Sequence, residues 1–415
     1  MTDPVVSPTP CADGRSAFRW LLQALACIAS ACVPSSEAPT TSGTVSTVLW
    51  QLSASPKASI GVIEGDQRQQ LVRVTAAWKH ADGRIIVLDG GRSSMSFYDS
   101  VGGYLYSVGR RGVGPGEFER LVSAWPYRAD SIALFDFMRQ RLSVFDGAGR
   151  FARSFGNPIR YERAPGMMPA ESCCAITGSF TDGTLFGHAP DHIPVEVGPP
   201  RYGVASVFTV SADGAVASRI GAFESRLYSY DPSAPSHVRH YEGAYSFRYV
   251  AVGDTLFGSN GQTPALLAIR RAIPGVDTLR LPGEPKPFTG EVQAAFEHAL
   301  REDYTLRGRR AYEGSLESNL PHQYAPTVPR FTALMSSRDG QLWLQQWTPR
   351  AGRHAAPVEF HVFSTAASQL ATITFPAGSR LLWAGMGQVI LLERDSLDVQ
   401  YVRLYDVVAP LPLGR

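Results

Sequence analysis

Short apolar segments alternate with polar turns along most of the chain, and the alternation repeats. Residues 85–89 (IIVLD) match residues 132–136 (IALFD), which follow 47 residues later. Residues 95–102 (MSFYDSVG) match residues 142–149 (LSVFDGAG) with the same spacing. Each unit contains four apolar segments separated by Gly- or Asp-bearing turns, which predicts four β-strands. Four strands at this period are typical of one β-propeller blade.

The first hairpin of each unit is a tight turn followed by an apolar strand. Asp-Gly suits such turns because glycine, and to a lesser degree Asp, tolerates the positive φ that a two-residue hairpin requires. The turn occurs six times, which predicts six blades: Asp82-Gly83, Asp130-Ser131, Asp182-Gly183, Gly253-Asp254, Asp339-Gly340 and Met386-Gly387.

The two ends of the repeat region suggest how the ring closes. Residues 48–63 have a strand-like pattern but precede the first blade, and the last unit ends near residues 402–408. We expect the N-terminal strand to complete the sixth blade and to cover an edge that would otherwise invite aggregation. The sequence therefore predicts an all-β fold over residues 48–415, a six-bladed β-propeller of four-stranded antiparallel blades.

Three segments depart from the strand pattern. Residues 189–202 and 224–245 are rich in Pro, His, Ser and Tyr and are predicted to form long rim loops. Residues 289–310 are predicted to be a helical insertion, since their apolar residues recur at helical spacing. That stripe contains Val292, Ala295, Phe296, Ala299 and Leu300.

The N-terminus has the features of an export signal. Arg15 and Arg19 precede a short apolar run, and the run ends in Ala29-Ser-Ala-Cys32. This ending is similar to a bacterial lipobox, in which the cysteine carries a lipid; ordinary cleavage without a lipid is the alternative. Residues 1–32 are thus predicted to be a signal peptide with Cys32 as the lipidation site. Residues 33–47 are predicted to be a flexible tether, which makes the protein a lipoprotein anchored in the periplasm or at the cell surface.

Composition narrows the partners. The formal net charge is only +2, and no cluster of Lys or Arg is present that could neutralise a run of phosphates. Nucleic acid is therefore excluded as a partner, and we expect a monomer.

Residues 109–121 (GRRGVGPGEFERL) have the composition of a phosphate-binding loop. Their glycine spacing, however, does not fit G-x-G-x-x-G, and Pro-Gly-Glu-Phe follows where a phosphate site needs a helix N-terminus. We interpret the stretch as the turn between two blades, with Phe118 or Leu121 anchored in the core. Its turn residues are Gly109, Gly112, Gly114, Pro115 and Gly116.

This turn, followed by the segment from Asp136 to Gly149, resembles the six-bladed propellers of the NHL-repeat type. It is especially similar to bacterial lipoproteins of that architecture, in which a G-x-G-P-G-E-F turn links successive blades. The resemblance is close over residues 70–156 and looser beyond. It implies the fold, and it implies no activity, because few of these proteins have an assigned one.

Histidines and carboxylates are the candidates for a metal site. His188, Asp191 and His192, with His237 and His240, could supply ligands for a divalent ion, although Pro190 excludes the helix that would align the first two histidines. Solvated loop histidines are the alternative. Asp89 and Asp136 end equivalent strands; we expect them to accept backbone N–H bonds rather than to line a pore.

Two classes of function remain open. The chain contains no G-x-S-x-G, H-E-x-x-H or P-loop motif. We therefore favour a binding or scaffold protein for a protein, peptide or carbohydrate. The alternative is a hydrolase, lactonase or lyase with a divalent metal in the central channel. The predicted recognition surface is the channel mouth with Tyr228, Tyr230, His237, His240 and Tyr245.

Overall fold

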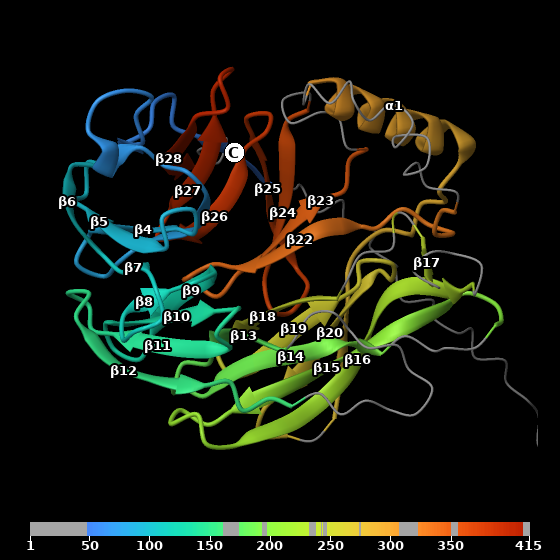
Figure 1. Ribbon diagram of the computed structural model, residues 1–415. Coiled ribbons are helices and arrows are strands. Elements are labelled where there is room, and N and C mark those ends of the chain that lie inside the picture. Colours follow the sequence, from blue (N-terminus) through green and yellow to red (C-terminus); the bar gives the residue numbers. More distant parts are fainter. Residues whose placement is uncertain are drawn as a thin grey trace, which may run out of the picture. The chain divides into compact units, whose positions relative to one another are not determined.

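The computed structural model describes residues 48–160, 174–192, 197–231, 238–241, 243, 247–273, 275–306, 323–349 and 356–409. Nearly all regular structure in these residues is β, arranged as six blades around a common centre (Figure 1). The last two blades are joined in one nine-stranded sheet. The chain is a six-bladed β-propeller, as the repeats predict. Each of the six predicted hairpin turns joins the first and second strands of one blade.

The bounds of the strands follow chain order. The first blade consists of β3 (Val74–Lys79), β4 (Ile85–Asp89), β5 (Ser94–Tyr98) and β6 (Tyr104–Val108). The second consists of β9 (Leu121–Tyr127), β10 (Ser131–Asp136), β11 (Arg141–Phe145) and β12 (Phe151–Gly156). The short strands β7 (Arg110–Arg111) and β8 (Glu117–Phe118) pair between these two blades.

The third blade is the longest, with β13 (Ala175–Ser179), β14 (Leu185–His192), β15 (Arg201–Val210), β16 (Ala217–Tyr230) and an added β17 (Val238–His240). The fourth has β18 (Arg248–Val252), β19 (Thr255–Ser259), β20 (Ala265–Arg270) and β21 (Asp277–Arg280). The fifth has β22 (Phe331–Ser336), β23 (Leu342–Gln346), β24 (Val358–Phe363) and β25 (Gln369–Phe375). The sixth has β26 (Arg380–Gly385), β27 (Gln388–Arg394) and β28 (Gln400–Val408).

The first strand of every blade lies innermost. In chain order, β3 contacts β9, β9 contacts β13, β13 contacts β18, and β18 contacts β22. The last innermost strand, β26, contacts β3. The backbone N–H of Arg338 donates to the carbonyl of Ala384 at 2.9 Å, which connects the fifth blade to the sixth. The six innermost strands therefore surround a central channel.

Apolar side chains fill the spaces between blades. Among the described residues, each pair of neighbouring blades has a hydrophobic cluster between its two members. The cluster between blades 1 and 2, for example, joins Phe97 of β5 to Phe118 and Leu134, all fully buried. Because each blade is apolar on both faces, no blade can bury its residues alone, and the ring forms as one unit.

The N-terminal strands close the ring as predicted. β2 (Ala58–Ile60) pairs antiparallel with β28 and completes the sixth blade. β1 (Val48–Leu52) extends further, because it pairs parallel with β25 of the fifth blade and antiparallel with the end of β28. Segments from the two ends of the described propeller thus hold the last two blades together.

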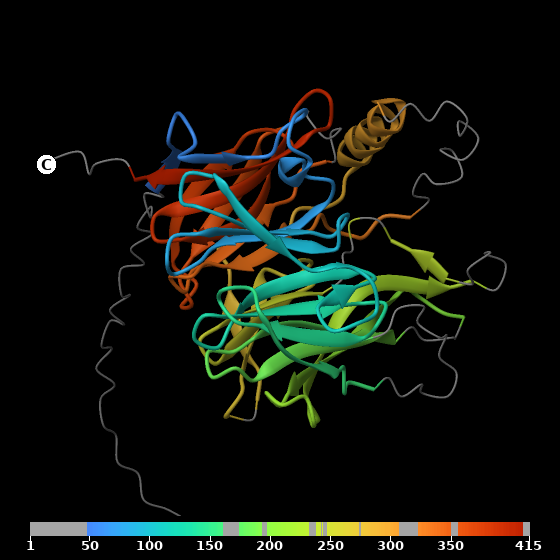
Figure 2. The ribbon, with the colours of Figure 1, turned by 60° about the vertical axis from the view of Figure 1, so that its left-hand side comes forward.

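The helical insertion is present as α1 (Gly290–Leu306), which lies beside the fifth blade in both views (Figures 1 and 2). Phe296 and Ala299 are buried, and Phe296 packs edge-on against Phe288. Ala295, expected in the apolar stripe, is exposed. Within the described residues, none of the helices has the length and apolar character needed to cross a membrane.

Both predicted rim loops are wrong in part. Residues 224–230 of the second predicted loop belong to β16, and residues 189–192 of the first belong to β14. In β16 the side chains of Phe223, Ser225 and Leu227 are buried, and those between them are exposed. Because the middle inward residue is a serine, the alternation was hidden in the sequence.

Candidate functional site

In the glycine-rich turn of residues 109–121, the Glu117 carboxylate binds groups of the turn itself. Glu117 Oε2 accepts a hydrogen bond from the backbone N–H of Gly114 at 3.0 Å, and Oε1 accepts one from Arg110 Nε at 2.7 Å. These bonds, that from Gly114 first, lower the pKa of Glu117. Phe118 and Leu121 are fully buried. The donors that an external phosphate would use are therefore occupied by an internal anion.

The two aspartates at the ends of the second strands, Asp89 and Asp136, accept hydrogen bonds from backbone N–H groups. The Asp136 carboxylate accepts from the N–H groups of Glu119, Arg120, Met138 and Arg139 at 2.7–3.3 Å. Asp89 does the same with four N–H groups of the first blade, at 2.9–3.2 Å. Both side chains are almost wholly buried. Neither lines a pore, so the structural interpretation of these carboxylates is confirmed.

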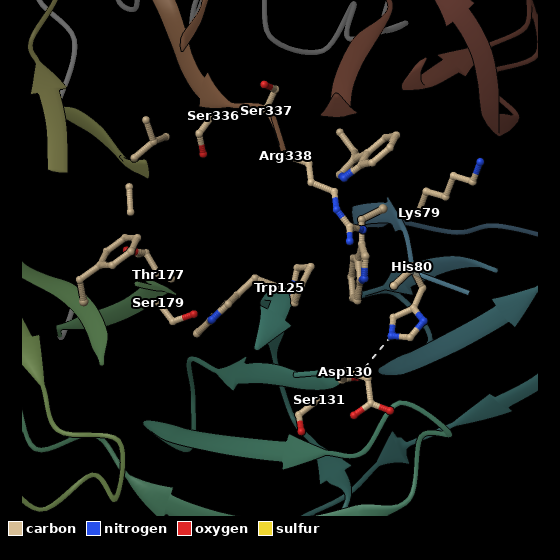
Figure 3. Close-up of a pocket in the computed structure, with 18 of the residues that line it drawn as sticks. Lys79, His80, Trp125, Asp130, Ser131, Thr177, Ser179, Ser336, Ser337 and Arg338 are labelled. Atoms are coloured by element: carbon tan, nitrogen blue, oxygen red, sulfur yellow. Dashed lines mark hydrogen bonds between the residues drawn. The ribbon is translucent and has the colours of Figure 1, made fainter. Parts of the chain in front are cut away.

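A pocket of about 500 Å³ lies where the innermost strands end (Figure 3). All six blades contribute lining residues, so the pocket belongs to the central channel. Its volume falls in the range of sites for small organic ligands. Its aromatic and polar lining includes Trp78, Lys79, His80, Trp125, Asp130, Ser131, Thr177, Ser179, Tyr249, Ser336, Arg338 and Trp383.

Three tryptophans give the pocket an aromatic wall. Trp78 and Trp125 occupy equivalent positions in β3 and β9, and Trp383 lies in β26. Trp78 is 3% exposed, and the indole Nε1 atoms of Trp78 and Trp125 are buried without a hydrogen-bond acceptor. An indole N–H can only donate, and an unpaired buried donor costs about 1–3 kcal/mol. The buried Nε1 atoms of Trp78 and Trp125 are out of a ligand's reach, so these two rings contribute aromatic carbon surface to the wall.

Most charged groups around the pocket already have partners. Lys79 Nζ donates to Gln388 Oε1 at 2.8 Å. The His80 ring lies between the Asp82 carboxylate, 3.0 Å from Nδ1, and the Asp130 carbonyl, 3.3 Å from Nε2. The hydrogen bond from Arg84 is the main reason why the pKa of Asp82 is lowered, so this carboxylate stays charged beside His80.

A polar contact joins the third blade to the fourth at the channel wall. The Tyr249 hydroxyl lies 2.8 Å from Thr177 Oγ1 and 2.8 Å from His188 Nδ1. Burial raises the pKa of Tyr249, so its hydroxyl stays protonated at neutral pH. This contact fixes the Tyr249 ring against the stacked ring of Phe247, 5.7 Å away, and keeps the wall rigid.

Of the predicted ligand-binding residues, the two whose side chains are described lie outside the pocket. Tyr228 and Tyr230 are in β16 and do not line the channel pocket. Tyr228 is buried and lies opposite His240 of β17 in the strand register. His237 and Tyr245 are outside the described residues, as is the side chain of His240. Whether this set binds a ligand stays a prediction.

The predicted metal set is only partly described. His188 contacts Tyr249, and the side chains of Asp191 and His192 lie outside the described residues. Among the residues that the structure does describe, no group of three or more His, Cys, Asp or Glu side chains is arranged to hold a metal ion. Cys32 also lies outside them.

The fold matches known propellers in sequence and in structure. Residues 69–159 match the model of the DUF5128 family, described as a 6-bladed beta-propeller. That match covers the first two blades, where the repeats are clearest. No curated protein matches the chain.

Among solved structures, a member of the DUF4221 family from Bacteroides vulgatus aligns with a TM-score of 0.52 at 9% identity, over 88% of this chain and 99% of the other. An exported protein from Bacteroides fragilis aligns with a TM-score of 0.47 at 12% identity, over 88% and 96%. Virginiamycin B lyase from Staphylococcus aureus aligns with a TM-score of 0.38 at 10% identity, over 85% and 88%. At these identities the likeness concerns the fold alone.

The channel tryptophans are the residues that sequence reasoning missed. Ala77-Trp78 and Ala124-Trp125 recur 47 residues apart, as the later strands of the same blades do. A tryptophan at one position of the innermost strand in two blades points to the channel, once the repeat register is extended backwards to that strand.

Proposed function

We propose that this protein is an exported, lipid-anchored binding protein of the cell envelope, whose ligand occupies the channel pocket. The observation that carries the proposal is the pocket itself, in which tryptophans from three blades and hydroxyl side chains from others meet in about 500 Å³. Aromatic faces with a few convergent polar groups are the usual composition of a ligand site.

The rigidity of the pocket wall favours a binding function rather than a catalytic site that has to move. Two of the tryptophans stand on strands that are paired with the next strand of the same blade: Trp78 pairs with Ile86, and Trp125 pairs with Ala133. A preformed site loses little conformational entropy when its ligand binds. The predicted export signal and tether in residues 1–47 support a location in the cell envelope.

A pocket-filling variant tests this function. Thermal-shift screening with a library of sugars, amino acids and short peptides is expected to find compounds that raise the melting temperature, because a ligand that binds only the folded state stabilises it. Ser336→Trp, which fills the pocket, should abolish that response. The matched control is Ser100→Trp, in an exposed turn away from the pocket. Equal responses of Ser336→Trp and wild type would place the ligand elsewhere.

A further inference from the structure

Arg338 is the pocket cation whose charge is not used within the described chain. Its side chain makes no hydrogen bond or ion pair with any described residue, whereas Lys79 and His80 both have partners. The neighbouring Asp339 accepts a hydrogen bond from the Met386 N–H at 2.7 Å and does not pair with it. Arg338 lines the pocket and is exposed to it.

The backbone fixes where this charge lies. The Arg338 N–H donates to the Ala384 carbonyl, so the base of the side chain is held at the junction of blades 5 and 6. Figure 3 shows the side chain running along the pocket wall from the Ser337 side towards His80, while the Asp130 carboxylate points away from the pocket. An anionic group in the pocket would thus meet a guanidinium without a competing carboxylate beside it.

One guanidinium selects a particular kind of anion. Arginine binds a carboxylate through two parallel N–H···O bonds, and a single positive charge balances a single negative one. A phosphate dianion needs further cations, but Figure 3 shows the Lys79 side chain directed away from the pocket, and the His80 ring is engaged with Asp82 and Asp130. The pocket therefore suits a monocarboxylate.

The other side chains of the pocket wall indicate the chemistry of the rest of the ligand. The half-buried indoles of Trp125 and Trp383 offer flat apolar faces to the pocket. Hydroxyls of Ser179 and Ser336 point into the open space in Figure 3. A ring with apolar C–H faces and several hydroxyl groups fits all of these, because it stacks on indoles and both donates and accepts hydrogen bonds.

We infer that the ligand of this pocket is a sugar acid, a uronic acid alone or at the end of a short oligosaccharide. Its carboxylate binds Arg338, and its ring lies against the tryptophans. This inference rests on the proposed function, because it names the class of ligand for the same site.

Calorimetric titration of the full-length protein with galacturonic acid, glucuronic acid and digalacturonic acid tests it, with galactose and glucose as the neutral matches. We expect at least one uronate to bind more than tenfold tighter than its neutral sugar. Arg338→Gln should remove that preference, so that the uronate binds no tighter than its neutral sugar. Arg338→Lys should restore only part of it, because lysine keeps the charge but not the two parallel bonds. Arg111→Gln, an exposed arginine outside the pocket, is the control and should bind as wild type.

The possible failures are distinguishable. A uronate affinity equal to that of the neutral sugar, or a preference that survives Arg338→Gln, would overturn the inference. Binding of an aromatic acid such as phenylacetate in preference to every uronate would overturn the sugar assignment and leave the binding function standing. If no compound binds and Ser336→Trp behaves as wild type, the proposed function itself fails.

Discussion

Single buried carboxylates hold the ends of blades in place. Asp136 is fully buried and accepts four backbone N–H groups, two from the segment that enters its blade and two from the turn after β10. The same arrangement at Asp89 explains why an aspartate ends the second strand of both clear repeats.

Replacing Asp136 should therefore be costly. We expect Asp136→Ala to lower the free energy of unfolding by about 3–5 kcal/mol, since several buried N–H groups lose their acceptor together. Urea denaturation followed by circular dichroism measures the change. Asp99→Ala is the control: its carboxylate bonds to Val101 and Gly103 in a solvent-accessible turn, and we expect a loss of about 1 kcal/mol. Equal losses in the two variants would contradict the buried-cap explanation.

Tyr98 makes stability depend on alkaline pH. Burial raises the pKa of its hydroxyl to about 12, from an ordinary value near 10. The folded state then holds the proton more tightly than the unfolded state, so this contribution is complete below pH 10 and is lost as the pH rises towards 12. We expect Tyr98→Phe to unfold like wild type at pH 8 and to be more stable than wild type by about 1 kcal/mol at pH 11.

Urea titrations at the two pH values check this expectation. The control is Tyr127→Phe, because Tyr127 is also buried but its hydroxyl donates to the Gly183 carbonyl at 3.1 Å. That variant should lose stability already at pH 8. A Tyr98→Phe variant whose stability falls with pH in parallel with wild type would exclude Tyr98 as the group responsible.

At the scale of elements, ring closure depends on a very short strand. β2 has only three residues, yet Ile60 is 2% exposed and packs into the cluster between blades 6 and 1. Gly61, which follows, has φ of +118°, and a Cβ there would lie 2.5 Å from the Gln400 carbonyl oxygen. The close approach of the two ends of the ring therefore requires glycine at this position.

Weakening β2 should open the ring. We expect Ile60→Ala to lower the free energy of unfolding by about 2–4 kcal/mol through the cavity it leaves. Ser59→Ala, on the exposed side of the same strand, should change it by less than about 0.5 kcal/mol. Thermal denaturation compares the two, and hydrogen exchange of β28 amides should rise only in Ile60→Ala. Unchanged protection of β28 would show that β1 alone closes the ring.

Element types followed from local pattern where the pattern was undisturbed. The hairpin turns and the first two blades could be located from Asp-Gly turns and alternating apolar residues. The long strand β16 could not, since its inward positions include Ser225, whose hydroxyl accepts a hydrogen bond from the Phe247 N–H at 3.2 Å. A partner 22 residues away satisfies this serine, and nothing local signals it.

At the scale of the whole molecule, the cellular address rests on the first 32 residues. We expect the protein to be recovered with membranes and Cys32→Ser to be recovered in the soluble fraction, because the thiol that carries the lipid is lost. Labelling with a radioactive fatty acid and fractionation measure both effects. Cys27→Ser lies within the cleaved signal and should keep the label. Label retained on Cys32→Ser would refute the lipid anchor.

The sequence by itself determined the blade plan, its number of repeats, the helical insertion and the closing strand. These features follow from periodicity and turn chemistry, which act over a few neighbouring residues. Only the tertiary structure decided where ligand chemistry gathers. The channel pocket draws Trp78, Thr177, Tyr249 and Arg338 from four blades. Their proximity arises from ring closure, a contact between positions hundreds of residues apart, so no local spacing in the chain encodes it.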